Sequence, residues 1–383
     1  MDLAFLLNLL NAPFAENIEK IALFILMLSV LIVLHEAGHF IVARLNGVRV
    51  NDFAIGFGPT LLKWTSPRSG TNYRINLLPI GGYCAMQGED GKTNEAEQQR
   101  AFRTAHELAS DNFQAKSPRQ RLAIVVAGPV ANFILAYLIM FVSAMTFGVG
   151  DMSKLSTLVG PLNAGYPAAA AGMQMGDRIV AIDGVPYDDG SKLVDKIHSS
   201  IGKTLSITFL HAGVRHTVKL TPRPSTIGGK RVGLIGFRPM PVYQRVAPGE
   251  AATLAGVALW NDIKTNLEGL GQLVVHPAQQ ASGVTGVIGM ERAAASLQDL
   301  GWAPYLDLAA LISIALGIFN LLPIPALDGG RASFIVAEMI RGRPVDPERE
   351  AFVHFAGFAV LMALMVFVAY HDVANIVSGK GVF

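Results

Sequence analysis

Residues 21–45 read IALFILMLSVLIVLHEAGHFIVARL, an apolar stretch that carries two histidines and a glutamate near its end. A helix needs about 20 predominantly apolar residues to cross a bilayer, so this stretch predicts a transmembrane helix. On such a helix His35 and His39 lie one turn apart on one face, where both imidazoles can reach a single metal ion. The stretch therefore predicts the class of fold, a membrane protein, and the place of its chemistry.

Three further apolar stretches have the length of a membrane span: residues 122–147, 305–322 and 352–370. The composition agrees, because 51% of the residues are hydrophobic, only 16% are charged, and the mean hydropathy is +0.40. We therefore expect an α-helical polytopic membrane protein with four transmembrane helices.

Charge and cysteine content exclude other classes. The net charge is only +2, and no run of Lys or Arg interleaves with aromatic residues, so a nucleic-acid partner is excluded. Cys84 is the single cysteine. A disulfide within the chain and a cysteine-based zinc cluster are thereby excluded, and a metal site must use histidines and carboxylates.

The distribution of basic residues predicts the orientation in the membrane. Ten Lys or Arg residues lie between the first two spans, whereas the short amino-terminal tail carries only Lys20. Basic loops stay in the cytoplasm, so this loop should be cytoplasmic. The connection after the third span agrees, since it holds Arg331, Arg341, Arg343 and Arg349. Both termini and the long middle segment are then expected outside, with the chemistry toward the cytoplasmic side.

The spans divide the chain into four parts. Residues 1–150 form the first half of the membrane core, and within them residues 52–88 alternate apolar residues with turn signals, which predicts a β-hairpin associated with the membrane. Residues 151–226 are Gly-rich and polar, typical of a small inserted α+β domain. Residues 227–300 form a linker with an amphipathic helix over 250–275. Residues 301–383 complete the membrane core.

The HExxH pattern over residues 35–39 suits metal-assisted hydrolysis, with Glu36 beside the open coordination position as the group that activates water. The alternative is a chance match or a structural polar cluster. An ionisable group inside a span costs roughly 2.5–3.5 kcal/mol, so three within five residues need a compensating partner. A zinc ion supplies one, which favours the metal hypothesis.

A third ligand is expected at the same depth. The third span runs into NLLPIPALDGG over residues 320–330, where prolines end the helix and allow Asp328 to point back at the metal. At a rise of about 1.5 Å per residue, His35 and Asn320 lie at similar depths in their spans. On these residues alone, Asp328 is as consistent with a helix terminus as with a ligand.

Asn132 is a polar amide in the second span, within Gly128-Pro129-Val130-Ala131-Asn132. Contact with substrate backbone, bracing of the site, and a plain interhelical hydrogen bond are all open for it.

Taken together, these residues resemble the site-2 protease family of intramembrane zinc metalloproteases, most closely its bacterial branch of the regulator-of-sigma-E protease type. The likeness is carried by HEAGH (35–39), GFGP (56–59), IGGY (80–83), AGPVANF (127–133) and NLLPIPALDGGR (320–331). It implies one zinc ion held by His35, His39 and Asp328, with Glu36 activating water and Asn320 positioning the substrate backbone.

The resemblance also implies partners and a location. Residues 168–186 look like part of a PDZ domain, of which only one is found. Residues 159–162 would be its peptide-binding loop, although a spacer or a size filter for substrates remains open. The implied substrates are single-span membrane proteins such as anti-sigma factors, and signal-peptide remnants. They would be held in extended form by strand addition to the hairpin. The implied location is the bacterial inner membrane.

Two rival functions use the same residues. A non-catalytic PDZ-bearing scaffold would bind zinc only for structure, but structural zinc sites usually have four protein ligands and only three are found. A metal transporter would carry zinc as cargo, but neither paired repeats nor ionisable groups in several spans are visible in the sequence.

Overall fold

The computed structural model describes residues 12–89, 110–163, 165–227, 229–276, 286–298 and 300–377. Among these residues, four helical segments are long and apolar enough to cross a membrane: Ile18–Leu45, Pro118–Phe147, Trp302–Leu321 and Arg349–Tyr370. Each corresponds to one of the four predicted spans, although the third ends at Leu321, one residue before the predicted end. The chain forms two compact units, the first within residues 12–140, 255–291 and 307–377 and the second within 141–254 and 292–306.

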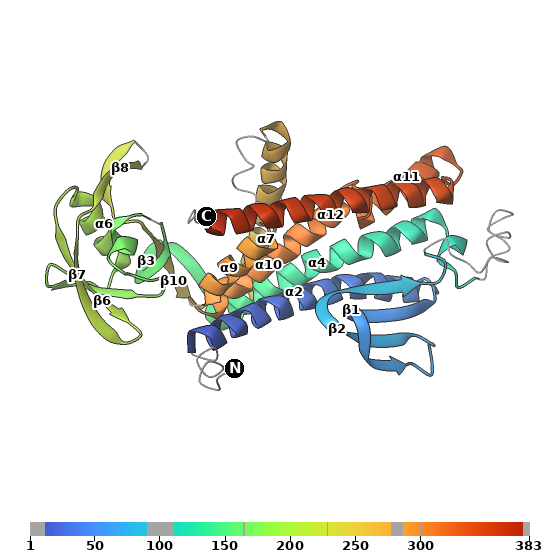
Figure 1. Cartoon of the computed structure of the whole chain (residues 1–383), viewed down its shortest axis with the longest axis horizontal. Helices are drawn as coiled ribbons and strands as arrows, with labels where there is room; N and C mark the ends of the chain where they lie inside the picture. The colour runs from blue at the N-terminus through green and yellow to red at the C-terminus, as the bar shows by residue number, and fades with distance from the viewer. Residues whose placement is uncertain are drawn as a thin grey trace, which may run out of the picture. The chain divides into compact units, whose positions relative to one another are not determined.

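Three of the long helices run side by side in the first unit: α2 (Ala12–Leu45), α4 (Pro118–Phe147) and α10 (Trp302–Leu321) (Figure 1). Glycines allow the close approach. A Cβ on Gly38 would lie 2.4 Å from the carbonyl oxygen of Ala127, and one on Gly317 would lie 3.0 Å from the ring of Phe133. Larger residues at these two positions would push α2 and α10 away from α4.

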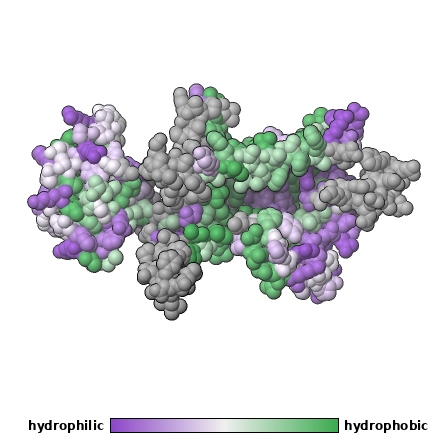
Figure 2. Space-filling model, in the orientation of Figure 1, coloured by the Kyte–Doolittle hydropathy of each residue, from purple (hydrophilic) through white to green (hydrophobic). Residues whose placement is uncertain are grey.

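The fourth long helix, α12 (Pro347–Val377), presents most of its side chains outward. Phe352, Phe355, Val360 and Phe367 are each at least 64% exposed. In Figure 2 the visible surface of this helix is largely green, the colour of hydrophobic residues. Apolar side chains exposed to water over such a length are costly, so this surface is suited to lipid. The helix is preceded by α11 (Asp328–Arg341), which ends at Gly342 in the left-handed conformation.

Between α2 and α4, β1 (Val50–Thr65) and β2 (Asn72–Met86) form an antiparallel hairpin over the predicted residues. Both strands bend, so that Phe53 pairs with Cys84 on one side and with Tyr73 on the other, while Tyr73 also pairs with Trp64. The paired segments therefore follow the order 82–86, 50–55, 72–76 and 60–65. A short 3-10 helix, η1 (Phe113–Ala115), precedes α4.

The hairpin lies along α2. The Ser29 hydroxyl donates a hydrogen bond to the Pro79 carbonyl, and the ring of Phe40 contacts the rings of Phe53 and Tyr73. Ser29 stands near the middle of the apolar segment of α2. The part of β2 at Pro79 therefore lies beside the middle of α2, a helix that is long and apolar enough to cross a membrane.

The second unit is built on a sheet of order β10-β3-β4-β6-β7, with β5 paired to β4. Its core gathers Ile179, Ile182, Leu193 and Ile207. The elements are β3 (Val149–Leu162), α5 (Pro167–Ala170), β4 (Arg178–Ile182), β5 (Val185–Pro186), α6 (Gly190–Ser199), β6 (Leu205–His211), β7 (Val214–Leu220), β8 (Arg223–Ile227), β9 (Lys230–Leu234) and β10 (Phe237–Gln244).

Two expectations for this unit differ from the structure. The sheet continues to Gln244, past the boundary expected at residue 226, because β10 pairs with β3. Residues 159–162 were expected to form a loop, and that prediction is wrong. They belong to β3, where Leu162 pairs with Phe237 and Leu158 pairs with Arg178. Val159 also pairs with Pro239 of β10, and β10 stands at an edge of the sheet.

The amphipathic helix expected over 250–275 is α7 (Pro248–Val275). In the first unit, its Leu259, Ile263 and Leu270 pack against a core cluster that includes Ile314 of α10. Trp260, at the side of this packed face, is 67% exposed. A short helix, α9 (Val287–Gln298), precedes α10.

Candidate active site

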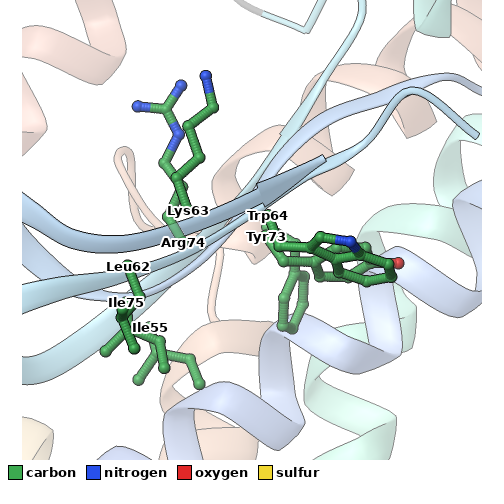
Figure 3. Close-up of a pocket in the computed structure, with 8 residues that line it drawn as sticks. Ile55, Leu62, Lys63, Trp64, Tyr73, Arg74 and Ile75 are labelled. Atoms are coloured by element: carbon green, nitrogen blue, oxygen red, sulfur yellow. The ribbon is translucent and has the colours of Figure 1, made fainter. Parts of the chain in front are cut away.

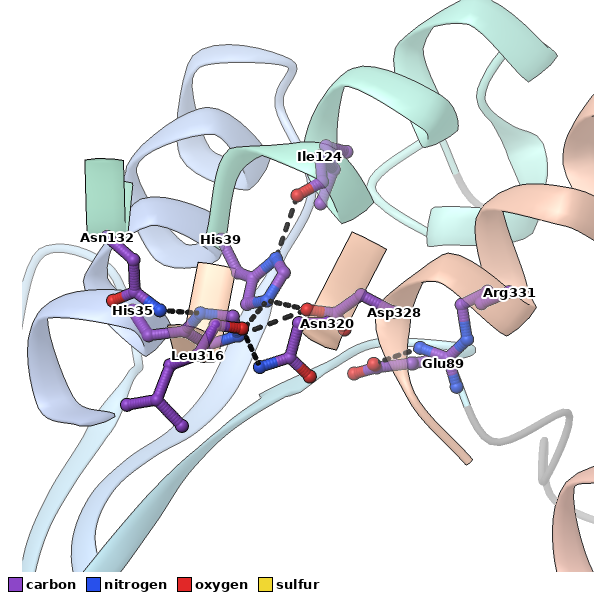
Figure 4. A network of polar contacts seen from close by, with 9 residues as sticks. All are labelled: His35, His39, Glu89, Ile124, Asn132, Leu316, Asn320, Asp328 and Arg331. Carbon is purple, nitrogen blue, oxygen red and sulfur yellow. Dashed lines mark hydrogen bonds and ion pairs between the residues drawn. The ribbon is translucent and has the colours of Figure 1, made fainter. Parts of the chain in front are cut away.

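The HExxH segment of α2 forms a metal-type cluster with the start of α11. The His35 Nε2 atom lies 3.0 Å from Asp328 Oδ2, His39 Nε2 lies 3.2 Å from the same oxygen, and the two Nε2 atoms are 3.2 Å apart. Both imidazoles are buried. Among the described residues, these three side chains are the only His, Cys, Asp or Glu group with metal-ligand spacing. Asp328, which the sequence left open between two roles, points at the histidines (Figure 4).

A sharp turn after α10 aims Asp328 at the cluster. Ala326 has a positive φ of 75°, and its N–H donates to Nδ1 of His354 on α12 at 2.9 Å. Gly329 follows, where a Cβ would lie 2.1 Å from the carbonyl oxygen of Leu322, so only glycine fits. Burial by itself would raise the pKa of the Asp328 carboxyl, but hydrogen bonds with His35 and His39 hold that pKa well below its usual range. The carboxyl is therefore ionised, as a metal ligand must be.

The cluster fits a zinc ion. With metal–ligand distances of about 2.0–2.2 Å, the ligand atoms of a tetrahedral site lie roughly 3.3–3.6 Å apart. The three observed distances of 3.0–3.2 Å approach that spacing. Space beside the donor atoms is kept by Gly128 of α4, since a Cβ there would lie 2.2 Å from His39 Nε2. Two imidazoles and one carboxylate are also a donor set found in catalytic zinc sites.

The α4 helix orients both imidazoles from behind. Nδ1 of His39 bonds the carbonyl oxygen of Ile124 at 2.8 Å, and Nδ1 of His35 lies 3.1 Å from the Asn132 amide nitrogen. The Asn132 side chain is fully buried. Sequence reasoning singled out Asn132 but missed Ile124 and Gly128. A backbone carbonyl leaves no signature in a sequence, and the only signal for Gly128 was the Gly-Pro pair in an apolar helix.

Glu36 is half-buried beside the hairpin. A Cβ on Gly82 of β2 would lie 3.7 Å from its Cγ and 3.8 Å from Val33 Cγ2. Strand β2 therefore passes the predicted general base at van der Waals distance.

The remaining predicted residue, Asn320, is half-buried near the end of α10, and Figure 4 shows it beside Asp328. Its amide donates to the Leu316 carbonyl in its own helix at 3.0 Å. Farther along α11, Arg331 forms an ion pair with Glu89, which follows β2. Burial by itself would lower the pKa of the Arg331 guanidinium, but the charge of Glu89 and its hydrogen bond raise that pKa above its usual value. The guanidinium is therefore permanently charged.

Four helices with the length and apolarity of membrane spans, together with a His-His-Asp group that has metal-ligand spacing, are the features expected of a membrane-embedded metallohydrolase. The chain belongs to Peptidase family M50, whose family model matches residues 23–364.

Relatives matched over nearly their whole length support this assignment. The chain is 29% identical to zinc metalloprotease RasP of Geobacillus kaustophilus, a match that covers 94% of this chain and 98% of the relative. It is 29% identical to the regulator of sigma-E protease RseP of Salmonella typhimurium, over 93% and 99%. It is 35% identical to a putative zinc metalloprotease of Clostridium acetobutylicum, over 92% and 97%.

Part of the chain is also similar to the PDZ domain of an SdrC-like protein from Listeria monocytogenes. That match has a TM-score of 0.20 and 24% identity, and it covers 23% of this chain and 92% of the other. The family assignment makes this protein an integral-membrane zinc metalloprotease. The resemblance to the site-2 protease family is thereby confirmed.

Proposed function

We propose that this protein hydrolyses peptide bonds within or near the transmembrane segments of single-span membrane proteins. In this proposal His35, His39 and Asp328 hold the zinc ion, and Glu36 is the general base. The observation that carries it is the meeting of three donor atoms within 3.0–3.2 Å inside an apolar helix bundle. A soluble substrate cannot reach a cluster buried in this way, whereas a transmembrane segment can.

The chemistry requires few groups. When bound, zinc polarises the scissile carbonyl and lowers the pKa of a water molecule toward about 7. Glu36 accepts a proton from the attacking water and delivers it to the leaving amine as the carbon–nitrogen bond breaks. Water adds to the carbonyl carbon, so the products are one carboxylate and one amine, with no other reactant. Asn320 is positioned to hold the substrate backbone, after its amide leaves the Leu316 carbonyl.

A transmembrane helix must unwind before its peptide bonds can be cut, and the exposed backbone groups then need partners. The hairpin supplies them in this proposal, by strand addition along segment 82–86, which is at one edge of the paired segments. Support comes from Gly82, whose position beside Glu36 would bring a substrate paired to β2 next to the general base.

Membrane association of the hairpin is part of the proposal. One face of its segments 50–55, 72–76 and 60–65 is apolar, and there Ile55, Ile75 and Leu62 line an open pocket of about 490 Å³. In Figure 3 these three side chains point to one side of the strands, and Lys63 and Arg74 point to the other. Leu62 is 65% exposed. A surface of this kind suits the boundary between lipid and the cytoplasm.

Orientation and location follow from charge. We assign the basic hairpin loop and the connection after α10, which holds Arg331, Arg341, Arg343 and Arg349, to the cytoplasm; in this proposal the metal cluster lies toward that side. We assign the β-rich unit to the outer side of a bacterial inner membrane as a PDZ-like domain. There, the edge strand β10 binds a substrate peptide or the unit excludes bulky substrates. Anti-sigma factors and signal-peptide remnants are the substrate classes that we propose.

The test is cleavage of a model single-span substrate by the full chain, purified in detergent. Wild type is compared with Glu36→Gln and with wild type plus a chelator, and bound zinc is measured in each sample. We expect cleavage by wild type alone, with zinc retained in Glu36→Gln. Full activity of Glu36→Gln would overturn the mechanism. Tightly bound zinc without cleavage of any substrate in a panel would favour a scaffold, and zinc exchange across vesicles would favour a transporter.

A further inference from the structure

We infer that Asn132 is a positioning residue for the metal: its amide oxygen accepts the His35 Nδ1–H, which leaves the lone pair of His35 Nε2 free for zinc. This inference rests on the proposed zinc site. It assigns a definite role to an amide that the sequence left open between substrate contact, bracing and helix packing.

The two histidines are held in different ways. Nδ1 of His39 faces the Ile124 carbonyl at 2.8 Å, and a carbonyl can only accept. The proton of His39 is therefore fixed on Nδ1, and Nε2 presents a lone pair to the cluster. Nδ1 of His35 instead faces the Asn132 amide at 3.1 Å. An amide can donate or accept, so the orientation of Asn132 decides which nitrogen of His35 carries the proton.

Two arrangements of this pair follow. With the Asn132 nitrogen toward Nδ1, His35 carries its proton on Nε2, where it faces Asp328 Oδ2 at 3.0 Å. That arrangement is closed to a metal, and it leaves the buried Asn132 Oδ1 without a hydrogen-bond partner among the described residues. A half-turn of the amide exchanges its oxygen and nitrogen with little change in shape. The oxygen then accepts from Nδ1–H, and both Nε2 atoms present lone pairs beside the Asp328 carboxylate.

The surroundings of Asn132 favour this role over substrate contact. Its side chain is fully buried, and the Ser313 hydroxyl of α10 donates to its backbone carbonyl at 2.9 Å. Ile124 and Asn132 are also two turns apart on α4, so one face of that helix sets the tautomers of both imidazoles.

The experiment measures zinc affinity of the full chain in detergent, by competition with a chromogenic chelator, and the absorption spectrum of the cobalt(II) form. Asn132→Leu removes the acceptor, whereas Asn132→Asp keeps an acceptor and removes the donor. Ser313→Ala is the matched control, because it removes the hydrogen bond to the backbone of residue 132 and spares the amide.

We expect Asn132→Leu to bind zinc about 10- to 100-fold more weakly, with an altered cobalt spectrum. Asn132→Asp and Ser313→Ala should stay close to wild type in both measurements. Wild-type zinc affinity in Asn132→Leu would overturn the inference. So would an Asn132→Asp variant that loses as much zinc affinity as Asn132→Leu, because the Asn132 amide would then act as a hydrogen-bond donor to His35. If Asn132→Leu does not fold, the comparison of Asn132→Asp with wild type still decides. A wild-type chain that binds no zinc would instead overturn the proposed function.

Discussion

A Cβ atom on Gly128 would lie 2.2 Å from His39 Nε2, closer than any real Cβ contact. The glycine of α4 thus keeps open the space in front of the donor atoms. Because Gly128 is inside a helix, the backbone itself tolerates a side chain, and only the space beside the two imidazoles forbids one.

Gly128→Ala should therefore lose bound zinc while the helices stay folded. The methyl group must displace an imidazole, which breaks the spacing of the three ligands. Metal content of the purified protein measures this loss, and Gly269→Ala serves as a control because nothing lies within 4 Å of its Cβ position. The control should retain zinc, with a helix stabilised by up to about 1 kcal/mol. Full zinc occupancy in Gly128→Ala would contradict the placement of the metal.

Asp328→Ala should weaken zinc binding by more than about 100-fold. Loss of a residue that only hydrogen-bonds a metal ligand costs up to about 100-fold in affinity, and in the proposed site Asp328 is itself a ligand. The variant removes one of three ligands and leaves two imidazoles without a counter-charge. Chelator competition measures the affinity. Asp346→Ala is a suitable control, since Asp346 is a more exposed carboxylate whose partner Arg349 is 3.8 Å away. A variant at Asp328 with wild-type affinity would show that another group completes the site.

Gly82→Ala should lower cleavage without loss of zinc. A Cβ there would lie 2.8 Å from the Ala54 carbonyl oxygen, so β2 must move away from β1 and from Glu36. Misplacement of a substrate by about 1 Å costs on the order of 100-fold in rate, so we expect a 10- to 100-fold fall in kcat/KM. Zinc content and cleavage are measured on one preparation. Loss of zinc in parallel would assign Gly82 to the metal site instead of the substrate strand.

Arg331→Met should destabilise the first unit, because it leaves the Glu89 carboxylate partly buried without its partner. The ion pair ties the end of the hairpin to the helix that begins with Asp328. A double-mutant cycle with Glu89→Gln, followed by thermal unfolding in detergent, should give a coupling energy of roughly 1–3 kcal/mol. Arg343→Met, at an exposed position, should leave the melting temperature unchanged. Additive effects of the two substitutions would indicate that the pair contributes no coupling.

The local features of this protein could be predicted from its residues alone. Apolar runs of bilayer length fixed the four spans, because each helix satisfies its own backbone hydrogen bonds and needs only apolar side chains outward. The spacing of His35 and His39 fixed their common face, since helical geometry depends on neighbours in the chain alone. Alternating residues and turn signals likewise predicted the hairpin over 52–88, which β1 and β2 occupy.

How distant segments meet depends on the packing of the folded chain. Asp328 is 293 residues from His35, and no local pattern distinguished a ligand from a helix end there. The role of α4 was equally hidden, because the Ile124 carbonyl and the space at Gly128 act through packing. The same reason explains the missed boundary at residue 226: β10 joins its sheet by pairing with β3, a contact between segments about 80 residues apart that depends on the folded chain.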